Sequence, residues 1–571
     1  MRTKTALKGA AAVAALSLAM LPGAALAERG SSGHLNIIYW QAPSLLNPYL
    51  SGGTKEIDSS NIILEPLARY DQNGELVATL AEEIPTLDNG GVSEDLRSIT
   101  WRLQEGLLWS DGTPVTSADV VFSAEYCMHP EGGCASLRFF SDVESVEALD
   151  ELTVRVNFTE PQPMPYTAFV GPYTPIIQQA QFADCMGARA PECTDANFGP
   201  IGTGPFVVTD FRTNDVFTAV ANPNFRHPDR PFFATLTFQG GGDAASAGRA
   251  VMETGEMDYA WNLQLAPDVI ESMARGGRGQ PVSAFGTLVE RIEINFTDPS
   301  SSLPSDIRST REAPHPILTD IRVREALSRA IDRDLLVEIG FGDAGRPTCN
   351  LVPAPPAFAS DANDDCLVQD MDRARELLDE AGWVPGPDGI RVKDGMRLEL
   401  DYLTSTNEVR QDFQALIQQW WREIGVESNI RNVSASVFFG GDPGSPDTFQ
   451  KFYADVEMYA NQFAGTDPQQ YLGALRCGME PRPATQWQGE NINRFCSEEY
   501  DALHAQLTQT ADMDERARIS RELNDILMQN YVMIPLVHRG RVSAVSNTLG
   551  GVLMNTWDTE LSNIADWYRI Q

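Results

Sequence analysis

The stretch WRLQEGLLWSDGTPVTSADVVFS occupies residues 101–123 and has the pattern of a strand, a tight turn and the start of a helix. Apolar anchors on the strand and the turn are supplied by Trp101, Leu103, Leu107 and Trp109. Asp111 and Gly112 favour the turn. Thr116 or Ser117 can cap the helix that follows. This segment therefore predicts architecture rather than a binding site.

Strand and helix patterns alternate along the rest of the chain. Apolar runs predict strands at residues 35–39, 98–103 and 153–158. Capping aspartates and apolar spacings of three and four predict helices at residues 59–68, 320–329, 370–382, 408–424 and 514–528. Asn73 and Gly74 predict a hairpin turn. The mixture indicates an α/β protein without internal repeats.

Residues 101–123 resemble the signature segment of the family 5 (cluster C) extracellular solute-binding proteins, which include oligopeptide, dipeptide and nickel binders. The resemblance continues through IILEPLARYDQNGELVATLAEE (62–83), IGTGPFVVTDF (201–211), ILTDIRVREALSRAIDRDLL (317–336) and ARELLDEAGW (374–383). It implies a fold like that of the type II periplasmic binding proteins. Such a fold has two α/β lobes, a subdomain inserted in the first lobe and a ligand cleft between the lobes.

The length of 571 residues exceeds what one hydrophobic core usually supports, which is about 250 to 300 residues. We therefore expect several domains, with boundaries that follow the resemblance. The first lobe comprises residues 28–76, 201–293 and 536–571, the inserted subdomain residues 77–200, and the second lobe residues 294–535.

The N-terminus has the features of a cleavable signal peptide over residues 1–27. Arg2, Lys4 and Lys8 precede an apolar run at residues 10–21, and Ala27 ends a small-residue cleavage site. The run is shorter than the roughly 20 residues of a membrane-spanning helix. We expect a mature periplasmic protein without a lipid anchor, because no cysteine lies near the cleavage site.

The chain is strongly acidic, with 79 Asp and Glu against 43 Lys and Arg and a formal net charge of -36. This charge disfavours nucleic acid and anionic membranes as partners. We interpret it mainly as a source of solubility, and a cationic ligand stays open as an alternative. The basic residues are nearly all Arg, which suits fixed ion pairs.

Eight cysteines form four pairs of sequence neighbours: Cys127 with Cys134, Cys185 with Cys193, Cys349 with Cys366, and Cys477 with Cys496. In an exported protein these neighbours predict four local disulfides. Zinc ligation is the alternative, but the spacings contain no CxxC pair and the six His are scattered. We expect neither a metal nor another cofactor.

Four segments are candidates for ligand contact. A loop at residues 46–52 matches the rim of the first lobe, and its candidates are Asn47, Tyr49, Ser51 and Gly52. Trp261 and Asn262 follow a short strand that faces the cleft in the family. Residues 290–299 resemble a strand that crosses between lobes. Residues 459–477 match the segment that lines the family's pocket, with candidates Asn461, Gln462, Thr466, Asp467 and Gln470.

Each of these segments also has a purely structural interpretation. The loop can be an ordinary turn, the Trp can belong to the core, and residues 290–299 can be a hinge alone. In peptide-binding members an acidic residue of the fourth segment pairs with the ligand's amino terminus, and Asp467 is the nearby carboxylate here. Because Pro468 follows it, a turn role for Asp467 is equally open.

The resemblance leaves the ligand class open. We expect a short peptide first, with an oligosaccharide, a glycoside or an opine as alternatives, because amides and aromatics near residue 460 suit sugars too. Nickel is disfavoured because the six His form no spaced pair. The resemblance also implies a monomer that closes over its ligand and docks on the inner-membrane permease of an ABC importer with a separate ATPase.

Catalysis is not expected. The sequence contains no GxSxG elbow, HExxH, GxxxxGK[ST] or strand-linked GxGxxG motif. A secreted hydrolase remains as an alternative from another class, and so does a receptor-docking or chaperone protein. A hydrolase would turn over a bound glycoside or peptide instead of retaining it.

Overall fold

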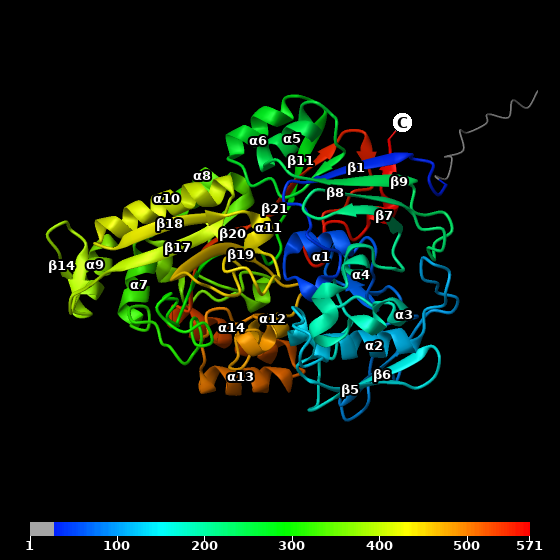
Figure 1. Cartoon of the computed structure of the whole chain (residues 1–571), viewed down its shortest axis with the longest axis horizontal. Coiled ribbons are helices and arrows are strands. Elements are labelled where there is room, and N and C mark those ends of the chain that lie inside the picture. Colours follow the sequence, from blue (N-terminus) through cyan, green and yellow to red (C-terminus); the bar gives the residue numbers. More distant parts are fainter. Residues whose placement is uncertain (1–27, 571) are drawn as a thin grey trace, which may run out of the picture.

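The computed structural model describes residues 28–570, and its first large element is a seven-stranded sheet (Figure 1). Its strands, in spatial order, are β11 (Gly279–Ala284), β21 (Arg541–Ser546), β10 (Tyr259–Ala260), β1 (His34–Tyr39), β9 (Thr235–Gly240), β8 (Val216–Ala221) and β7 (Phe206–Arg212). Helices α5 (Ala244–Met252) and α6 (Pro267–Ala274) pack on it, at the top of Figure 1.

A six-stranded sheet lies on the other side of the molecule (Figure 1). Its order is β13 (Gly345–Pro347), β20 (Met533–Arg539), β12 (Val289–Ile294), β19 (Val456–Asn461), β17 (Glu399–Ser405) and β18 (Glu427–Val433). Its core contains apolar side chains from α7 (Ile321–Arg329), α8 (Arg333–Gly340), α9 (Met371–Glu380) and α10 (Glu408–Glu423). Every residue of β12 is buried, although three of its six residues are Glu or Arg. This strand is therefore a place where charge is held inside the protein.

The chain crosses between the two sheets at two neighbouring points. Strand β11 leads into β12 through residues 285–288, and β20 leads into β21 through Gly540. The predicted lobe boundaries at 293/294 and 535/536 fall inside β12 and β20, which pair with each other in the six-stranded sheet. We therefore propose that the lobes divide at 285–288 and at Gly540. The other predicted boundaries stay predictions.

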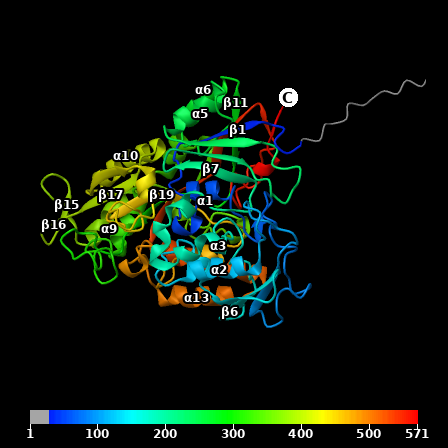
Figure 2. The same cartoon turned by 45° about the vertical axis from the view of Figure 1, so that its right-hand side comes forward.

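A separate layer lies below the seven-stranded sheet in both views (Figures 1 and 2). It contains a three-stranded sheet of β4 (Ser98–Arg102), β6 (Thr153–Phe158) and β5 (Val143–Ala148), with α2 (Ser117–Met128) packed against it. Thr116 and Asp119 form a capping box at the start of α2. Trp101 and Trp109 lie in the core of this layer. The strand, turn and helix predicted for residues 101–123 are confirmed.

The other predicted elements are mostly confirmed. Strand β1 and helices α7, α9, α10 and α14 (Met513–Gln529) match their predicted ranges within a few residues, and β2 (Ala68–Tyr70) and β3 (Leu76–Ala78) form the predicted hairpin. The helix predicted at 59–68 is wrong, because α1 spans Thr54–Ser60. The Asn61 amide donates to the carbonyls of Ile57 and Pro172 at the end of α1, and Pro66 disfavours helix further on.

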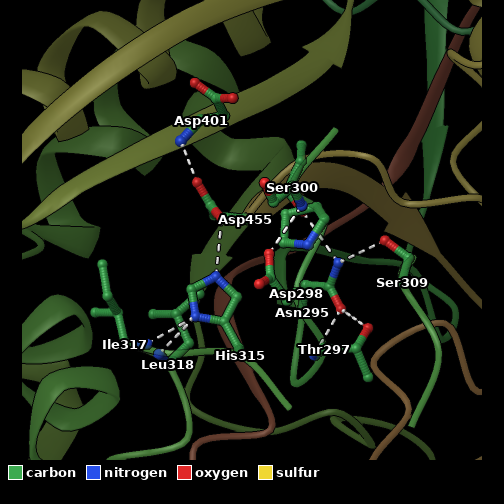
Figure 3. A network of polar contacts seen from close by, with 12 residues as sticks. Asn295, Thr297, Asp298, Ser300, Ser309, His315, Ile317, Leu318, Asp401 and Asp455 are labelled. Carbon is green, nitrogen blue, oxygen red and sulfur yellow. Dashed lines mark hydrogen bonds and ion pairs between the residues drawn. The ribbon is translucent and has the colours of Figure 1, made fainter. Parts of the chain in front are cut away.

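The segment that follows β12 is fixed to the six-stranded sheet by polar contacts (Figure 3). His315 Nε2 lies 2.8 Å from Asp455 Oδ1, and Asp455 Oδ2 accepts from the backbone N–H of Asp401 at 2.6 Å. His315 Nδ1 accepts from the backbone N–H groups of Ile317 and Leu318 at 3.0 and 2.9 Å. Nδ1 therefore acts as an acceptor, and both ring nitrogens have structural partners.

All four predicted disulfides are confirmed: Cys127–Cys134, Cys185–Cys193, Cys349–Cys366 and Cys477–Cys496. Within residues 28–570, no helix combines the length and the apolar character needed to cross a bilayer. The predicted signal peptide, residues 1–27, lies outside the residues that the structure describes.

Candidate ligand-binding site

A cavity lies where the two sheets meet the layer that contains β4, β5, β6 and α2, which we call the inserted layer. The cavity contains about 1140 Å³ not filled by protein atoms, including space open to solvent. The side of the seven-stranded sheet contributes Gln41, Trp261, Asn262, Gln264 and Arg541. The side of the six-stranded sheet contributes Leu288, Arg410, Tyr459, Asn461 and Arg539. The inserted layer contributes Ala135, Ser136, Arg138 and Tyr173. The cavity thus has walls from all three layers.

Aromatic rings form two parts of the wall. Trp261 stacks on Tyr39 with ring centroids 4.6 Å apart and an interplanar angle of 4°. Tyr459 packs edge-on against Phe439 and Phe449, with centroids 6.0 and 5.4 Å away. Trp261 and Tyr459 follow or belong to strands of different sheets, so an apolar part of a ligand would meet a rigid ring on either side.

Two buried arginines share one carboxylate in this wall. Arg410 Nε lies 2.5 Å from Glu290 Oε1, and Arg539 Nε lies 3.2 Å from Glu290 Oε2. Burial lowers the pKa of Arg539 to about 10, opposed by Glu290 and reinforced by the nearby charge of Arg410. The pair of arginines therefore holds more positive charge than Glu290 can neutralise.

The remaining cations of the wall have different partners. Arg138 pairs with Glu490, and Lys55 pairs with its sequence neighbour Glu56. Arg541 donates to the Gln462 side chain at 3.2 Å and to two backbone carbonyls at 2.9 and 3.0 Å, which are all neutral acceptors.

The wall also contains the carboxylate of Glu560. It accepts from the hydroxyl of Tyr259 and from Ser543 Oγ, the latter at 2.6 Å. Both donors belong to strands of the seven-stranded sheet, so Glu560 is fixed in place on that side of the cavity.

Direct contacts join the opposite sides around the cavity. Asn407 Nδ2 donates to Gln264 Oε1 at 2.6 Å, and Gln486 Nε2 donates to the carbonyl of Glu131 at 2.8 Å. The backbone N–H of Gly465 donates to the carbonyl of Trp557 at 2.6 Å. Because these hydrogen bonds join opposite sides of the molecule, we call the arrangement closed.

Five of the predicted contact residues line the cavity: Gly52, Trp261, Asn262, Asn461 and Gln462. The other first-loop candidates are buried beside it. Asn47 donates to Tyr126 OH and Asn197 Oδ1, Tyr49 OH donates to the Pro175 carbonyl, and Ser51 Oγ accepts from the Gly53 N–H. These bonds connect the loop to the inserted layer and to α1.

The predicted group Thr466, Asp467 and Gln470 is not part of the cavity wall. Asp467 Oδ2 lies 2.7 Å from Arg516 Nη2, and Asp467 Oδ1 accepts from the Gln469 N–H at the start of α12 (Gln469–Gly473). Thr466 lies beside the hairpin turn at Gly74. Asp467 thus makes the turn contact that its neighbour Pro468 indicated, and its other oxygen is paired with Arg516.

Sequence reasoning missed the charged part of the wall: Lys55, Arg138, Arg410, Glu490, Arg539, Arg541 and Glu560. One local signal was available. The stretch IPLVHRGRVSAV, residues 534–545, has two arginines around a glycine inside an otherwise apolar run. A buried strand with paired arginines points to fixed charge beside a cavity or a partner carboxylate.

Comparison with known proteins agrees with this geometry. A family model described as bacterial extracellular solute-binding proteins, family 5 Middle, matches residues 75–478. The glutathione-binding protein GsiB of Shigella boydii is 24% identical over 510 residues, which cover 89% of this chain and 89% of that protein.

Solved structures of similar fold cover nearly the whole chain. The oligopeptide-binding protein AppA of Bacillus subtilis, in complex with a nonapeptide, has a TM-score of 0.79 at 20% identity and covers 95% of this chain and 100% of that one. NikZ of Campylobacter jejuni, in complex with Ni(L-His), has a TM-score of 0.77 at 20% identity over 94% and 100%. The expected fold of the type II periplasmic binding proteins is confirmed.

Proposed function

This chain belongs to the bacterial extracellular solute-binding proteins of family 5, and from that membership we propose that it captures a short peptide in the central cavity and delivers it to a permease. Proteins of this family bind solutes for ABC importers and are not enzymes. The proposed partner is the inner-membrane permease of such an importer, and the proposed place of action is the periplasm.

The charges of the cavity wall carry the peptide proposal. The wall has carboxylates at Glu490 and Glu560 and cations at five positions. A zwitterionic peptide offers a charged group for each sign, whereas a neutral oligosaccharide would leave buried charges without new partners. The relatives named for glutathione and for oligopeptide binding support the same class.

The proposed mechanism is a change in the relative position of the two lobes. In this mechanism the neighbouring crossings at 285–288 and at Gly540 act as the hinge, and both lobes contribute residues to the cavity wall. A ligand that touches both walls binds the closed form more tightly and shifts the population toward it. The closed form is then the one that docks on the permease.

The test is calorimetric titration of the mature protein after removal of any bound solute by unfolding and refolding. Di- to nonapeptides are compared with α- and β-linked oligosaccharides and with opines. We expect a peptide to bind and to raise the melting temperature, since ligand at about 100 times Kd adds about 2.7 kcal/mol to the stability. Binding of oligosaccharides alone would overturn the peptide proposal.

Mass spectrometry of the same mixtures distinguishes the other classes. A binding protein leaves a bound peptide intact, whereas a secreted hydrolase produces fragments. A docking or chaperone protein would bind unfolded chains and show no affinity for any small solute.

A further inference from the structure

The charge balance of the cavity wall is opposite to that of the chain. The whole sequence has 79 acidic and 43 basic residues. The cavity wall has two carboxylates, Glu490 and Glu560, against five cations, which are Lys55, Arg138, Arg410, Arg539 and Arg541. All five cations are at most 7% exposed. A concentration of buried positive charge in so acidic a protein requires a partner anion.

The carboxylates around the cavity do not supply enough negative charge. Lys55 pairs with Glu56, Arg138 with Glu490, and Arg410 and Arg539 share Glu290. Arg541 has three neutral acceptors and no carboxylate in direct contact.

Three more carboxyl groups lie on the side of the seven-stranded sheet, and one of them, Asp558, is near Arg69 as well as Arg541 and has its pKa raised by burial. Glu560 is hydrogen-bonded to Tyr259 and Ser543. When Glu560 is counted with Glu56, Glu290 and Glu490, these four carboxylates face five cations. Asp58 lies behind the wall near Arg541 and Glu560, and burial raises the pKa of Asp58 to about 7. It therefore carries only part of a negative charge near neutral pH.

The unsatisfied hydrogen-bonding groups of the wall are also of one kind, donors rather than acceptors. Among the described residues that line the cavity, four buried side-chain atoms lack a hydrogen-bond partner, and all four are nitrogen donors: Gln41 Nε2, Arg138 Nε, Gln264 Nε2 and Arg539 Nε. Arg539 Nε is near Glu290 but is not aligned to donate.

The orientation of the Gln264 amide is fixed independently. Its Oε1 accepts from both Asn407 Nδ2 and Asn262 Nδ2, so its nitrogen is the free atom. Unsatisfied buried donors are costly, and a ligand rich in acceptor oxygens would satisfy them.

We propose that the cavity selects an acidic solute, one with more carboxylate than ammonium groups, and that Arg539 and Arg541 receive its extra carboxylate. This inference rests on the proposed function, because it names the class of solute within the same cavity. It excludes the cationic ligand that the acidity of the whole chain left open. Two guanidinium groups on either side of Gly540 also place the anion at the crossing between the lobes.

The test compares peptides that differ by one charge. Calorimetry measures each member of a series of di-, tri- and tetrapeptides that contain either Glu or its neutral isostere Gln at the same position. We expect the Glu peptide of the tightest-binding pair to bind at least about tenfold more tightly than its Gln counterpart. Equal affinities, or a preference for the Gln peptide, would overturn the inference.

The variant Arg539→Gln tests the location of the anion. Glu290 keeps its contact with Arg410 in this variant, so no buried carboxylate is left alone. We expect the preference for the acidic peptide to fall to about threefold or less. The matched control is Arg346→Gln, since Arg346 lies in β13 beside β20 but outside the cavity, and it should keep the full preference. An unchanged preference in Arg539→Gln would overturn the role of that residue.

The two proposals fail in different ways. If neutral peptides bind and acidic ones do not, the peptide proposal stands and the acidic solute is wrong. If no peptide binds but a polycarboxylate opine does, the acidic solute stands and the peptide proposal is wrong. Binding of a neutral oligosaccharide alone would contradict both.

Discussion

Asp467 is the carboxylate partner of Arg516, with Oδ2 2.7 Å from Nη2 and 2.8 Å from Nε. Arg516 is fully buried in α14 and also donates to the carbonyls of Leu507 and Thr510 and to Gln469 Oε1. This one guanidinium therefore joins α12, the end of α13 (Glu498–Thr508) and α14. The carboxylate that the sequence placed near the ligand thus serves the packing of three helices.

Replacement of Asp467 by Ala should destabilise the protein without changing its affinity for solute. Removal of one partner of a buried ion pair costs about 3 to 5 kcal/mol, and partial exposure of Asp467 reduces this to roughly 2 to 4 kcal/mol. Urea unfolding measures the loss, and calorimetry measures the affinity. Asp372→Ala is the control, because Asp372 is 93% exposed in its pair with Arg375. Loss of affinity at unchanged stability would return Asp467 to the site.

The disulfide Cys477–Cys496 should stabilise the same region. It closes a loop with a sequence separation of 19 between α12 and α13. Replacement of both cysteines by Ala should lower the free energy of unfolding by about 3 kcal/mol, chiefly because the unfolded chain gains freedom. Urea unfolding measures this loss. The comparison is the variant with both Cys127→Ala and Cys134→Ala, whose disulfide spans a sequence separation of 7. Its loss should be smaller, because a shorter loop contributes less entropy. An unchanged stability for the 477–496 variant would contradict the prediction.

Local patterns predicted the elements well because caps, turns and apolar spacing act within a few residues. The hairpin at Asn73–Gly74 and the helix after Thr116 are examples. The helix predicted at 59–68 failed because its end depends on Asn61, whose amide reaches Pro172 far along the chain. The lobe boundaries stay predictions, and the division that we propose at 285–288 and Gly540 depends on which sheet each strand joins.

The site was harder to predict because its charges meet only through the fold. Glu290 lies 120 positions from Arg410 in the sequence, and no local pattern connects them. Asp467 and Arg516 lie 49 positions apart, so the carboxylate seemed available when only its neighbours were considered. Trp261 was within reach of sequence reasoning because the family resemblance placed its strand.

His504 should make the stability sensitive to acid. Burial, reinforced by the charge of Arg476, lowers the pKa of His504 to about 4. Its Nε2 lies 2.9 Å from the carbonyl of Gln469, and its buried Nδ1 has no partner, so a second proton would create an unsatisfied donor. The neutral ring is the form that fits the folded protein.

The sign of the effect follows from this lowered pKa. His504 takes up a proton near pH 6.5 in the unfolded chain but only near pH 4 in the folded protein. Its contribution to the free energy of unfolding is therefore complete above pH 6.5 and is lost as the pH falls toward 4. Between pH 7 and pH 5 the wild type should lose roughly 2 kcal/mol more stability than His504→Gln. Urea unfolding at both pH values measures the difference, and equal losses in the two proteins would contradict the prediction.

Gly465 lies at a contact that forms between the two sides of the molecule. It follows β19 of the six-stranded sheet, and its backbone donates to Trp557. Gly465 has φ +74°, and a Cβ atom there would lie 2.5 Å from Cζ of Tyr70 in the β2–β3 hairpin. A methyl group at this position therefore opposes the closed arrangement.

Gly465→Ala should weaken solute binding by about tenfold, because part of the binding free energy must then displace Tyr70. Small-angle X-ray scattering should show less compaction on addition of solute than in the wild type. Gly478→Ala is a matched control, since Gly478 has φ +87° and no atom within 4 Å of the added methyl group. It carries the same backbone strain without the clash, so it should lose stability but keep affinity and closure. If both variants lose affinity equally, strain rather than the contact with Tyr70 is responsible, and Gly465 has no special part in closure.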